Sequence, residues 1–355
     1  MLNISKISKG AAALATIVSL TTSCKKEYIT NEYITNEYVT NVYDSEYYST
    51  ILNSQEEITT DVRPPYLKAG DTVAICAASN SVTEANLADG IAKLESWGLK
   101  VKLADNVYAV DGRYAGTIGQ RVEGLQKMID NPNVKAIIMA RGGYGASQIL
   151  SFVDFKMMLS NPKWLVGYSD VTALHIALNN IGVESIHGPM MNGFTKDTES
   201  MDALKDALFG NNYKSVSIKS NANCIEGTAE GRLVGGNLSL IYSEGGTLFD
   251  LNAKGGILFI EDTGEANYSV DRMLTNLKLS GKLDAVRGIV IGQFINGTQG
   301  NDKSIAEIVA EKVADLKIPV MYGLQSGHDT KNIPLYLGRK VKLTVDSEKA
   351  TLEFQ

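Results

Sequence analysis

Cysteine and histidine are both scarce in this chain, each occurring three times in 355 residues. Cys24, Cys76 and Cys224 are too few for the disulfide framework that staples small secreted domains. Cys76 lies in an apolar run and is expected in the core, whereas Cys224 lies in a polar stretch. No histidines and cysteines have the spacing of metal ligands, so the sequence predicts no metal site.

Runs of basic residues are absent too, and the chain carries a net charge of −6. It offers no electrostatic footprint for nucleic acid, which we exclude as a partner. Apolar residues make up 44% of the sequence and charged residues 21%, as in globular proteins and unlike disordered ones. A length of 355 residues exceeds the usual size of one hydrophobic core, so we expect two domains.

A long hydrophobic run is missing as well, because the apolar stretch near the N-terminus covers only residues 10–20. It is too short to span a bilayer as a helix, but its place after Lys6 and Lys9 is typical of an export signal. Cys24, preceded by a small residue, follows in a pattern that resembles a bacterial lipoprotein signal. We expect removal of residues 1–23 and a lipid anchor on Cys24, which would hold the protein in the cell envelope on a membrane, facing the periplasm or the exterior. An ordinary secretory signal cut nearby is the alternative.

Residues 27–41 hold three copies of a five-residue unit, Glu-Tyr-Ile-Thr-Asn or Glu-Tyr-Val-Thr-Asn. Such a unit is too short for a solenoid repeat, which needs roughly 20 residues or more. We interpret residues 24–62 as a polar tether that keeps the following domains away from the membrane. A specific partner site in this Tyr-rich segment is the alternative.

Apolar runs and helical patterns alternate between residues 63 and 194, beginning after the structure-breaking pair Pro64-Pro65. This alternation predicts an N-terminal α/β domain with a parallel sheet. Ligands of such sheets bind at the carboxyl ends of the strands. The predicted strands are 72–77, 101–103, 134–139 and 164–166, and the predicted helices are 87–97, 121–129, 146–150 and 171–179.

The pattern changes after residue 194. Residues 195–227 are polar and weakly periodic, and we expect them to form a linker. Residues 228–355 are richer in strand patterns and predict a smaller C-terminal domain of mixed α/β type. Its predicted strands are 255–260, 286–291, 341–345 and 350–354, and its predicted helix is 270–279. The fold class is therefore α/β.

Two junctions between a predicted strand and a predicted helix could carry chemistry. In the first, Arg141-Gly-Gly-Tyr-Gly145, glycines let backbone N–H groups approach a ligand, although a plain tight turn explains the same pattern. This junction lacks the lysine and the spacing of a phosphate-binding loop. The second, Gly167-Tyr-Ser-Asp170, places Ser169 as in a nucleophile elbow. Val171 replaces the second glycine of that motif, and on spacing alone a helix N-cap is the favoured role for Ser169.

A serine nucleophile needs a base, and the three histidines are the candidates. His175 lies within an apolar helical pattern and is expected to be buried and structural. His187 could line a site or cap a turn. His328 lies in a Gly-flanked loop of the second domain, and loops on a rigid scaffold are where catalytic bases tend to lie. Glu261 follows a predicted strand and is either solvated or part of a site.

Taken in order, these and neighbouring motifs resemble those of the LD-carboxypeptidases. That family includes muramoyltetrapeptide carboxypeptidases and the enzymes that confer immunity to microcin C. The resemblance runs from about Pro64 to the C-terminus. The motifs that carry it are residues 67–72, 115–117, 141–145, 167–174, 187–190, 231–238, 259–262, 271–274 and 327–328.

The resemblance implies a Ser-Glu-His triad in which Ser169 is the nucleophile, Glu261 the orienting carboxylate and His328 the general base. It assigns the oxyanion hole to the backbone N–H groups of Asp170 and Gly143. It also implies an active site between the two domains, a peptide substrate, a homodimer and no cofactor.

The implied reaction is hydrolysis of the amide between an L-configured centre and a C-terminal D-alanine. In peptidoglycan this converts a tetrapeptide stem to a tripeptide, as muropeptide recycling or remodelling requires. A peptidase that inactivates a microcin-like peptide conjugate is the alternative among enzymes. A muropeptide-binding lipoprotein without turnover is the alternative from another class.

Overall fold

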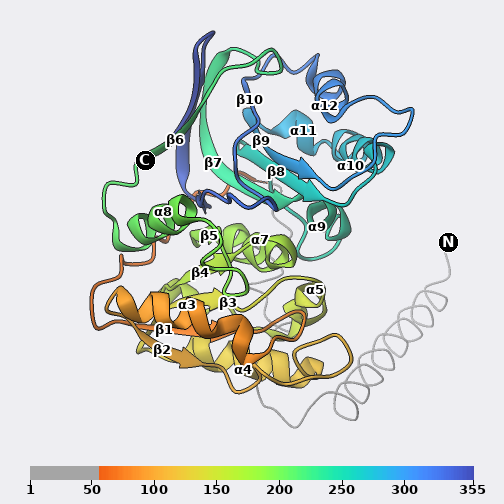
Figure 1. Cartoon of the computed structure of the whole chain (residues 1–355). Coiled ribbons are helices and arrows are strands. Elements are labelled where there is room, and N and C mark those ends of the chain that lie inside the picture. The colour runs from red at the N-terminus through yellow and green to blue at the C-terminus, as the bar shows by residue number, and fades with distance from the viewer. Residues whose placement is uncertain (1–55) are drawn as a thin grey trace, which may run out of the picture.

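The computed structural model describes residues 56–355. The expected signal peptide, the lipidation site Cys24 and the pentapeptide repeat lie outside these residues. The described chain forms two β-sheets, each with helices packed beside it, one above the other in Figure 1. The α/β class and the division into an N-terminal and a C-terminal domain are thereby confirmed.

The first sheet has six strands in the order β11-β5-β4-β3-β1-β2. The strands β1 to β5 run parallel, as the alternation of strand and helix patterns predicts. The strands are β1 (Thr72–Cys76), β2 (Lys100–Leu103), β3 (Val134–Met139), β4 (Trp164–Gly167), β5 (Ser185–His187) and β11 (Leu335–Leu337). Their helices are α3 (Glu84–Ser96), α4 (Ile118–Asp130), α5 (Ala146–Ile149), η2 (Leu150–Phe152), α6 (Met157–Ser160), η3 (Ser169–Val171) and α7 (Thr172–Asn180).

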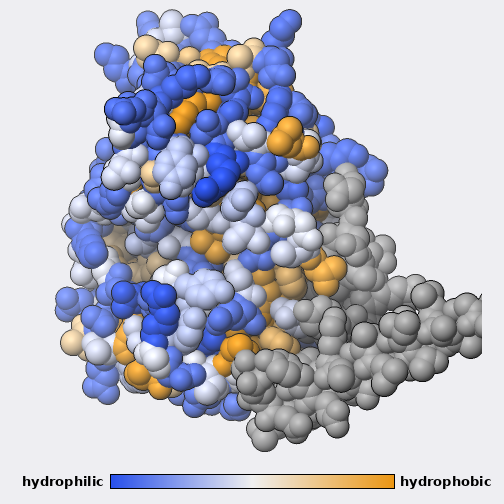
Figure 2. All heavy atoms as spheres, turned by 90° about the vertical axis from the view of Figure 1, so that its right-hand side faces the viewer, coloured by the Kyte–Doolittle hydropathy of each residue, from blue (hydrophilic) through white to orange (hydrophobic). Residues whose placement is uncertain are grey.

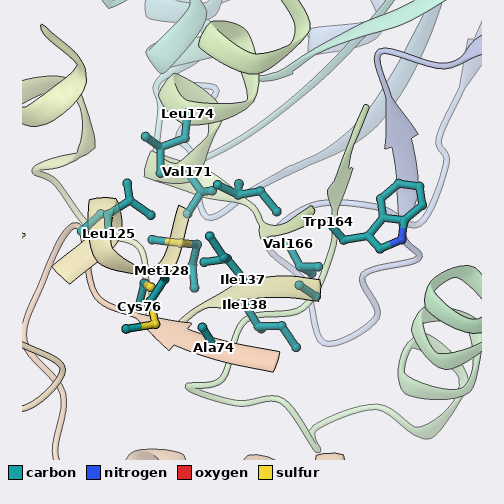
Figure 3. Close-up of a cluster of buried hydrophobic side chains, with 14 of the residues drawn as sticks. Ala74, Cys76, Leu125, Met128, Ile137, Ile138, Trp164, Val166, Val171 and Leu174 are labelled. Carbon is teal, nitrogen blue, oxygen red and sulfur yellow. The ribbon is translucent and has the colours of Figure 1, made fainter. Parts of the chain in front are cut away.

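The centre of this sheet is buried on both faces. In β3 every residue except Lys135 is buried, which explains why the strand is a continuous apolar run in the sequence. Figure 3 shows part of this core, where side chains from β1, β3 and β4 gather with Leu125 and Met128 of α4 and Leu174 of α7. A rigid layer of this kind holds the loops at the ends of the strands in fixed positions.

The strand β11 corrects the expectation of a purely parallel N-terminal sheet. It pairs antiparallel with β5, and Leu335 lies opposite His187. Residues 228–355 therefore contribute to both sheets and not to the C-terminal domain alone. The physical reason is that β11 covers the edge of β5 and buries Tyr336, whose ring centroid lies 5.5 Å from that of Trp164.

Residues 195–227 also differ from the expected linker. They form α8 (Thr198–Phe209) and β6 (Ser215–Lys219), and β6 joins the second sheet. The buried face of α8 is formed by Met201, Leu204, Ala207 and Leu208. These residues have helical spacing, which the polar composition of the segment concealed.

The second sheet has seven strands in the order β10-β9-β8-β7-β12-β13-β6. Pairs from β7 to β10 are parallel, and those from β7 through β12 and β13 to β6 are antiparallel, so the sheet itself is mixed. The remaining strands are β7 (Gly227–Asn237), β8 (Ile257–Thr263), β9 (Gly288–Ile295), β10 (Val320–Tyr322), β12 (Lys340–Val345) and β13 (Lys349–Phe354). The helices are α9 (Leu238–Ser243), α10 (Asn267–Leu279), α11 (Lys282–Ala285) and α12 (Ile305–Val313).

The two domains meet where the start of α7 lies against the end of β7. Gly236 has a φ of +139°, and a Cβ atom there would lie 2.6 Å from Oγ1 of Thr172. The backbone N–H of Asn237 donates a hydrogen bond to the same oxygen over 3.0 Å. A side chain at position 236 would separate the two elements, so the glycine allows the turn before α7 to reach the strand ends of the second sheet.

The surface of the molecule is mostly hydrophilic where it can be followed in Figure 2, which faces the right-hand side of Figure 1. Hydrophobic residues appear there only in small groups. Within residues 56–355, no helix combines the length and the apolar character needed to cross a membrane.

Candidate active site

Ser169 lies in the sharp turn η3 between β4 and α7. Its φ is +64°, a left-handed conformation that non-glycine residues rarely adopt and that marks backbone strain held by the surrounding fold. The N-cap position of η3 belongs to Tyr168 and that of α7 to Val171. The interpretation of Ser169 as a helix N-cap is therefore wrong, and the backbone has the form of a nucleophile elbow.

Gly167 is a steric requirement of this turn. A Cβ atom at position 167 would lie 2.8 Å from Cγ1 of Val171. The bulky residue that replaces the usual second glycine thus packs over the first one. Val171 is itself fully buried, so the second position of the motif is filled by a packed side chain and not by a glycine.

The Gly-rich loop after β3 packs directly against the serine. A Cβ atom on Gly142 would lie 3.1 Å from Cβ of Ser169 and 3.2 Å from its Oγ. On the other side, a Cβ atom on Gly143, whose φ is +118°, would lie 2.4 Å from the side-chain amide of Asn80. The loop is a tight turn that brings its backbone next to the Ser169 hydroxyl.

Asp170 ties the elbow to two neighbouring elements. Its Oδ2 accepts a hydrogen bond from Oγ of Ser79 over 2.5 Å and another from the backbone N–H of Ala146 over 2.8 Å. Burial raises the pKa of this carboxyl, and the hydrogen bonds oppose that rise. The Asp170 side chain therefore anchors the elbow to the loop after β1 and to the start of α5.

Glu261 and His328 form a direct pair. Nδ1 of His328 lies 2.6 Å from Oε2 of Glu261, which is fully buried at the end of β8. The histidine sits in the loop after β10 with 14% of its side chain exposed. A Cβ atom on Gly327, whose φ is +143°, would lie 2.9 Å from the same carboxylate oxygen, so a glycine here lets the loop approach. The bond orients the ring and leaves Nε2 to exchange a proton.

Burial and the ion pair act in opposite directions on the pKa values of this pair. Burial raises the pKa of Glu261, and the hydrogen bond with His328 opposes that rise. Burial by itself would lower the pKa of His328, but the bond to Glu261 and the charges of Glu261 and Asp262 raise it above its ordinary value of 6.5. The imidazole is therefore a stronger base than an isolated histidine.

Two contacts join the Ser169 turn to the Glu261–His328 pair. The ring of Tyr168 stands edge-on to that of His328, with centroids 4.9 Å apart. Asn237, which is bonded to Thr172, lies opposite Glu261 in the ladder between β7 and β8. The structure thus pairs Glu261 with His328 directly, and it links Ser169 to that pair through the neighbouring residues Tyr168 and Thr172.

The other two histidines are buried and lie outside the Glu261–His328 pair. The ring nitrogens of His175 lie 2.9 Å from Oγ of Ser185 and 2.9 Å from the carbonyl oxygen of Gly167, and burial lowers its pKa to about 4. Its predicted structural role is confirmed. His187 packs edge-on against Phe259, with centroids 4.9 Å apart, and burial lowers its pKa well below 6.5. Among residues 56–355, no cluster of His, Cys, Asp or Glu could hold a metal ion.

A cavity of about 250 Å³ opens beside His328. Its wall includes Tyr168 and Met190 of the first domain, Lys196 just before α8, and Asn296 of the second domain. A second hollow of about 540 Å³ lies at the carboxyl ends of β8 and β9, and Asn296 also lines it. The space beside the histidine is thus bounded by both domains.

The supporting residues Asp262, Ser79 and Tyr168 were not found from the sequence. Asp262 accepts hydrogen bonds from Nδ2 of Asn237 over 3.0 Å and from the backbone N–H of Ser239 over 2.9 Å, which holds α9 beside Glu261. In the sequence, Asp262 follows Glu261, Tyr168 precedes Ser169, and Ser79 comes shortly after the first strand. This closeness to predicted site residues was the only sign of their role. Their partners lie far along the chain, so only the tertiary structure shows what they bind.

Comparison with known proteins gives a consistent result. Residues 73–188 match the LD-carboxypeptidase N-terminal domain, and residues 230–343 match the LD-carboxypeptidase C-terminal domain. A Bacillus subtilis protein named "Probable murein peptide carboxypeptidase" is 32% identical, over 82% of this chain and 94% of that protein. The microcin C7 self-immunity protein MccF of Escherichia coli is 26% identical, over 81% of this chain and 95% of that protein.

A solved structure is similar over the same region. The muramoyltetrapeptide carboxypeptidase from Oxalobacter formigenes superposes with a TM-score of 0.73 at 28% sequence identity. The match covers 80% of this chain and 98% of that one. Both domains described above are therefore shared with that protein.

Proposed function

Because this chain belongs to the LD-carboxypeptidase family, a family of serine peptidases, we propose that it hydrolyses the amide between an L-configured centre and a C-terminal D-alanine in peptidoglycan tetrapeptides. The observation that carries this proposal is the Glu261–His328 pair, 2.6 Å apart, beside the strained turn of Ser169. Relatives named for murein peptides and muramoyltetrapeptides support the choice of substrate.

In the proposed mechanism, Nε2 of His328 accepts the proton of Ser169 Oγ as that oxygen attacks the substrate carbonyl carbon. Glu261 stabilises the imidazolium and fixes its orientation. The C–N bond then breaks, His328 gives the proton to the leaving amine, and an acyl-enzyme on Ser169 remains. Water activated by His328 hydrolyses that ester. The active site in this proposal lies between the two domains.

The proposed oxyanion hole consists of the backbone N–H groups of Asp170 and Gly143. The N–H of Asp170 follows the nucleophile in the elbow, which is the usual place for one donor. Gly143 follows Gly142, which packs against Ser169. Donors of this kind stabilise the negative charge that develops on the carbonyl oxygen in the transition state.

The test is to incubate the full chain and its Ser169→Ala variant with a disaccharide-tetrapeptide and to follow D-alanine by mass spectrometry. The proposal expects release by the first protein and not by the second. Release by both would exclude Ser169 as the nucleophile. Release by neither would overturn the tetrapeptide activity.

A second candidate, inactivation of a microcin-like peptide conjugate, is favoured by the 26% identity to the microcin C7 self-immunity protein. The same pair of proteins should then be given such a conjugate in a parallel assay. Ser169-dependent cleavage of the conjugate without D-alanine release would support this second activity over the first. Binding of the tetrapeptide without any cleavage would support a non-catalytic muropeptide-binding protein.

We further propose that Cys24 carries a lipid anchor and that the enzyme works in the cell envelope as a homodimer. The position of Cys24 after a short apolar stretch supports the anchor. A Cys24→Ser variant should move from the membrane fraction to the soluble fraction of the producing bacterium, and its unchanged distribution would contradict the anchor. The dimer is what the resemblance to the family implies. Light scattering of the protein without its first 55 residues should give twice the mass of one chain, and the mass of a single chain would contradict the dimer.

A further inference from the structure

The cavity beside His328 holds one unpartnered cation, Lys196. Within the described residues, its side chain makes no ion pair, whereas the neighbouring Lys331 is bonded to Glu199 over 2.5 Å. Its stem folds over Gly193, where a Cβ atom would lie 2.6 Å from Cε of Lys196. The glycine, with a φ of +90°, thus makes room for the lysine at the wall of the cavity.

The proposed chemistry determines which part of the substrate enters this cavity. In amide hydrolysis the general acid protonates the leaving amine, so the leaving group must lie on the side of the histidine. His328 and Tyr168 both line the cavity. The residue released from the C-terminus of the peptide would therefore occupy it.

A C-terminal residue carries a carboxylate one carbon away from the amine that His328 protonates. That charge loses water on entering the cavity and needs a cation or several N–H donors. Apart from His328 itself, Lys196 is the basic side chain in the wall of this cavity. We infer that Lys196 binds the terminal carboxylate of the substrate and so restricts the enzyme to the last peptide bond, an inference that rests on the proposed carboxypeptidase function.

Two acidic residues in the same wall strengthen the requirement for this lysine. Asp197 accepts hydrogen bonds from the backbone N–H of Ser200 over 2.7 Å and from its hydroxyl over 2.5 Å. Asp329 accepts one from the backbone N–H of Thr330 over 2.7 Å. Without Lys196 these carboxylates would leave the cavity negative and would repel the end of the substrate.

The experiment compares two substrates and four proteins. The substrates are the same tetrapeptide with a C-terminal carboxylate or a C-terminal carboxamide. The proteins are the wild type, Lys196→Met, Lys196→Arg and the control Lys331→Met, which removes a nearby charge outside the wall of the cavity. The readout is kcat/KM for release of the terminal residue, after thermal unfolding has shown that each variant is folded.

For Lys196→Met we expect kcat/KM to fall about 10- to 100-fold on the carboxylate substrate, the size of a charge-assisted hydrogen bond, and to change less than about threefold on the carboxamide. Lys196→Arg should recover most of the loss, and Lys331→Met should behave as the wild type. An equal loss on both substrates, or no loss on either, would overturn the role of Lys196. Failure of the wild type to release D-alanine at all would overturn the carboxypeptidase proposal instead.

Discussion

The serine turn of the N-terminal domain and the Glu261–His328 pair of the C-terminal domain are built in different ways. The turn is local: Gly167, Ser169 and Val171 lie within five residues, Val171 packs against Gly167, and Ser169 between them has a left-handed φ. The pair is assembled from residues 67 positions apart, on a strand end and a loop. One half of the site is thus encoded by neighbours in the chain, and the other by the order of strands in a sheet.

The largest expected effect on kcat comes from a change in the serine turn. Replacing Ser169 with Ala removes the attacking oxygen and should lower kcat by about 10⁴-fold or more, as for other serine hydrolases. D-alanine release from the tetrapeptide measures it. Ser160→Ala, on the exposed end of α6, is the matched control and should retain wild-type activity. Residual activity of Ser169→Ala within tenfold of the wild type would show that Ser169 is not the nucleophile.

A smaller loss of kcat is expected from changes in the Glu261–His328 pair. Glu261→Gln keeps the shape of the side chain but removes the charge that stabilises the imidazolium, so kcat should fall about 10³- to 10⁴-fold. Glu230→Gln, on the exposed part of β7, serves as the control. A loss of less than tenfold would mean that Glu261 only packs beside the histidine.

The pH dependence of kcat/KM tests whether Glu261 raises the pKa of His328. His328 must be neutral to accept a proton, and its pKa is raised above 6.5, so activity should fall as the pH drops through a value above 6.5. In Glu261→Gln, burial acts on His328 without the opposing carboxylate, so this acid limb should move to lower pH. An acid limb at the same pH in both proteins would contradict the pairing.

The smallest expected effects are on stability, and they distinguish His175, which has two buried hydrogen bonds, from His187. His175→Leu removes two buried hydrogen bonds, with the Gly167 carbonyl and with the Ser185 hydroxyl, and should lower the free energy of unfolding by about 2 kcal/mol. His187→Leu should cost within about 1 kcal/mol, because within the described chain neither ring nitrogen of His187 has a hydrogen bond of good geometry, and only the Asn332 side chain lies close enough to raise its pKa. Urea unfolding measures both values. Equal losses would show that the hydrogen bonds of His175 do not carry its role.

Prediction from the sequence was most successful where the signal was local. The strands from β1 to β4 and the helices between them follow from apolar runs and helical spacing, because a parallel sheet covered on both faces requires such runs. The prediction missed several short or edge elements, among them β5, β10 and α12, and the long strand β7. It also failed for α8 and β11. In α8 a polar composition hid a narrow buried face, and β11 is three residues long and depends on pairing with the distant β5.

By itself, the sequence determined the fold class, the two domains and the ordered motifs that indicate the family. It also placed Ser169 between a strand and a helix, but left open whether that serine lies in a nucleophile elbow or is the N-cap of the helix. The structure decided this question through the left-handed φ of Ser169 and the N-cap positions of Tyr168 and Val171. It also brought Glu261 to His328 and excluded the two buried histidines from that pair. Such decisions need the three-dimensional fold, because burial and hydrogen bonding depend on residues that are distant in the chain.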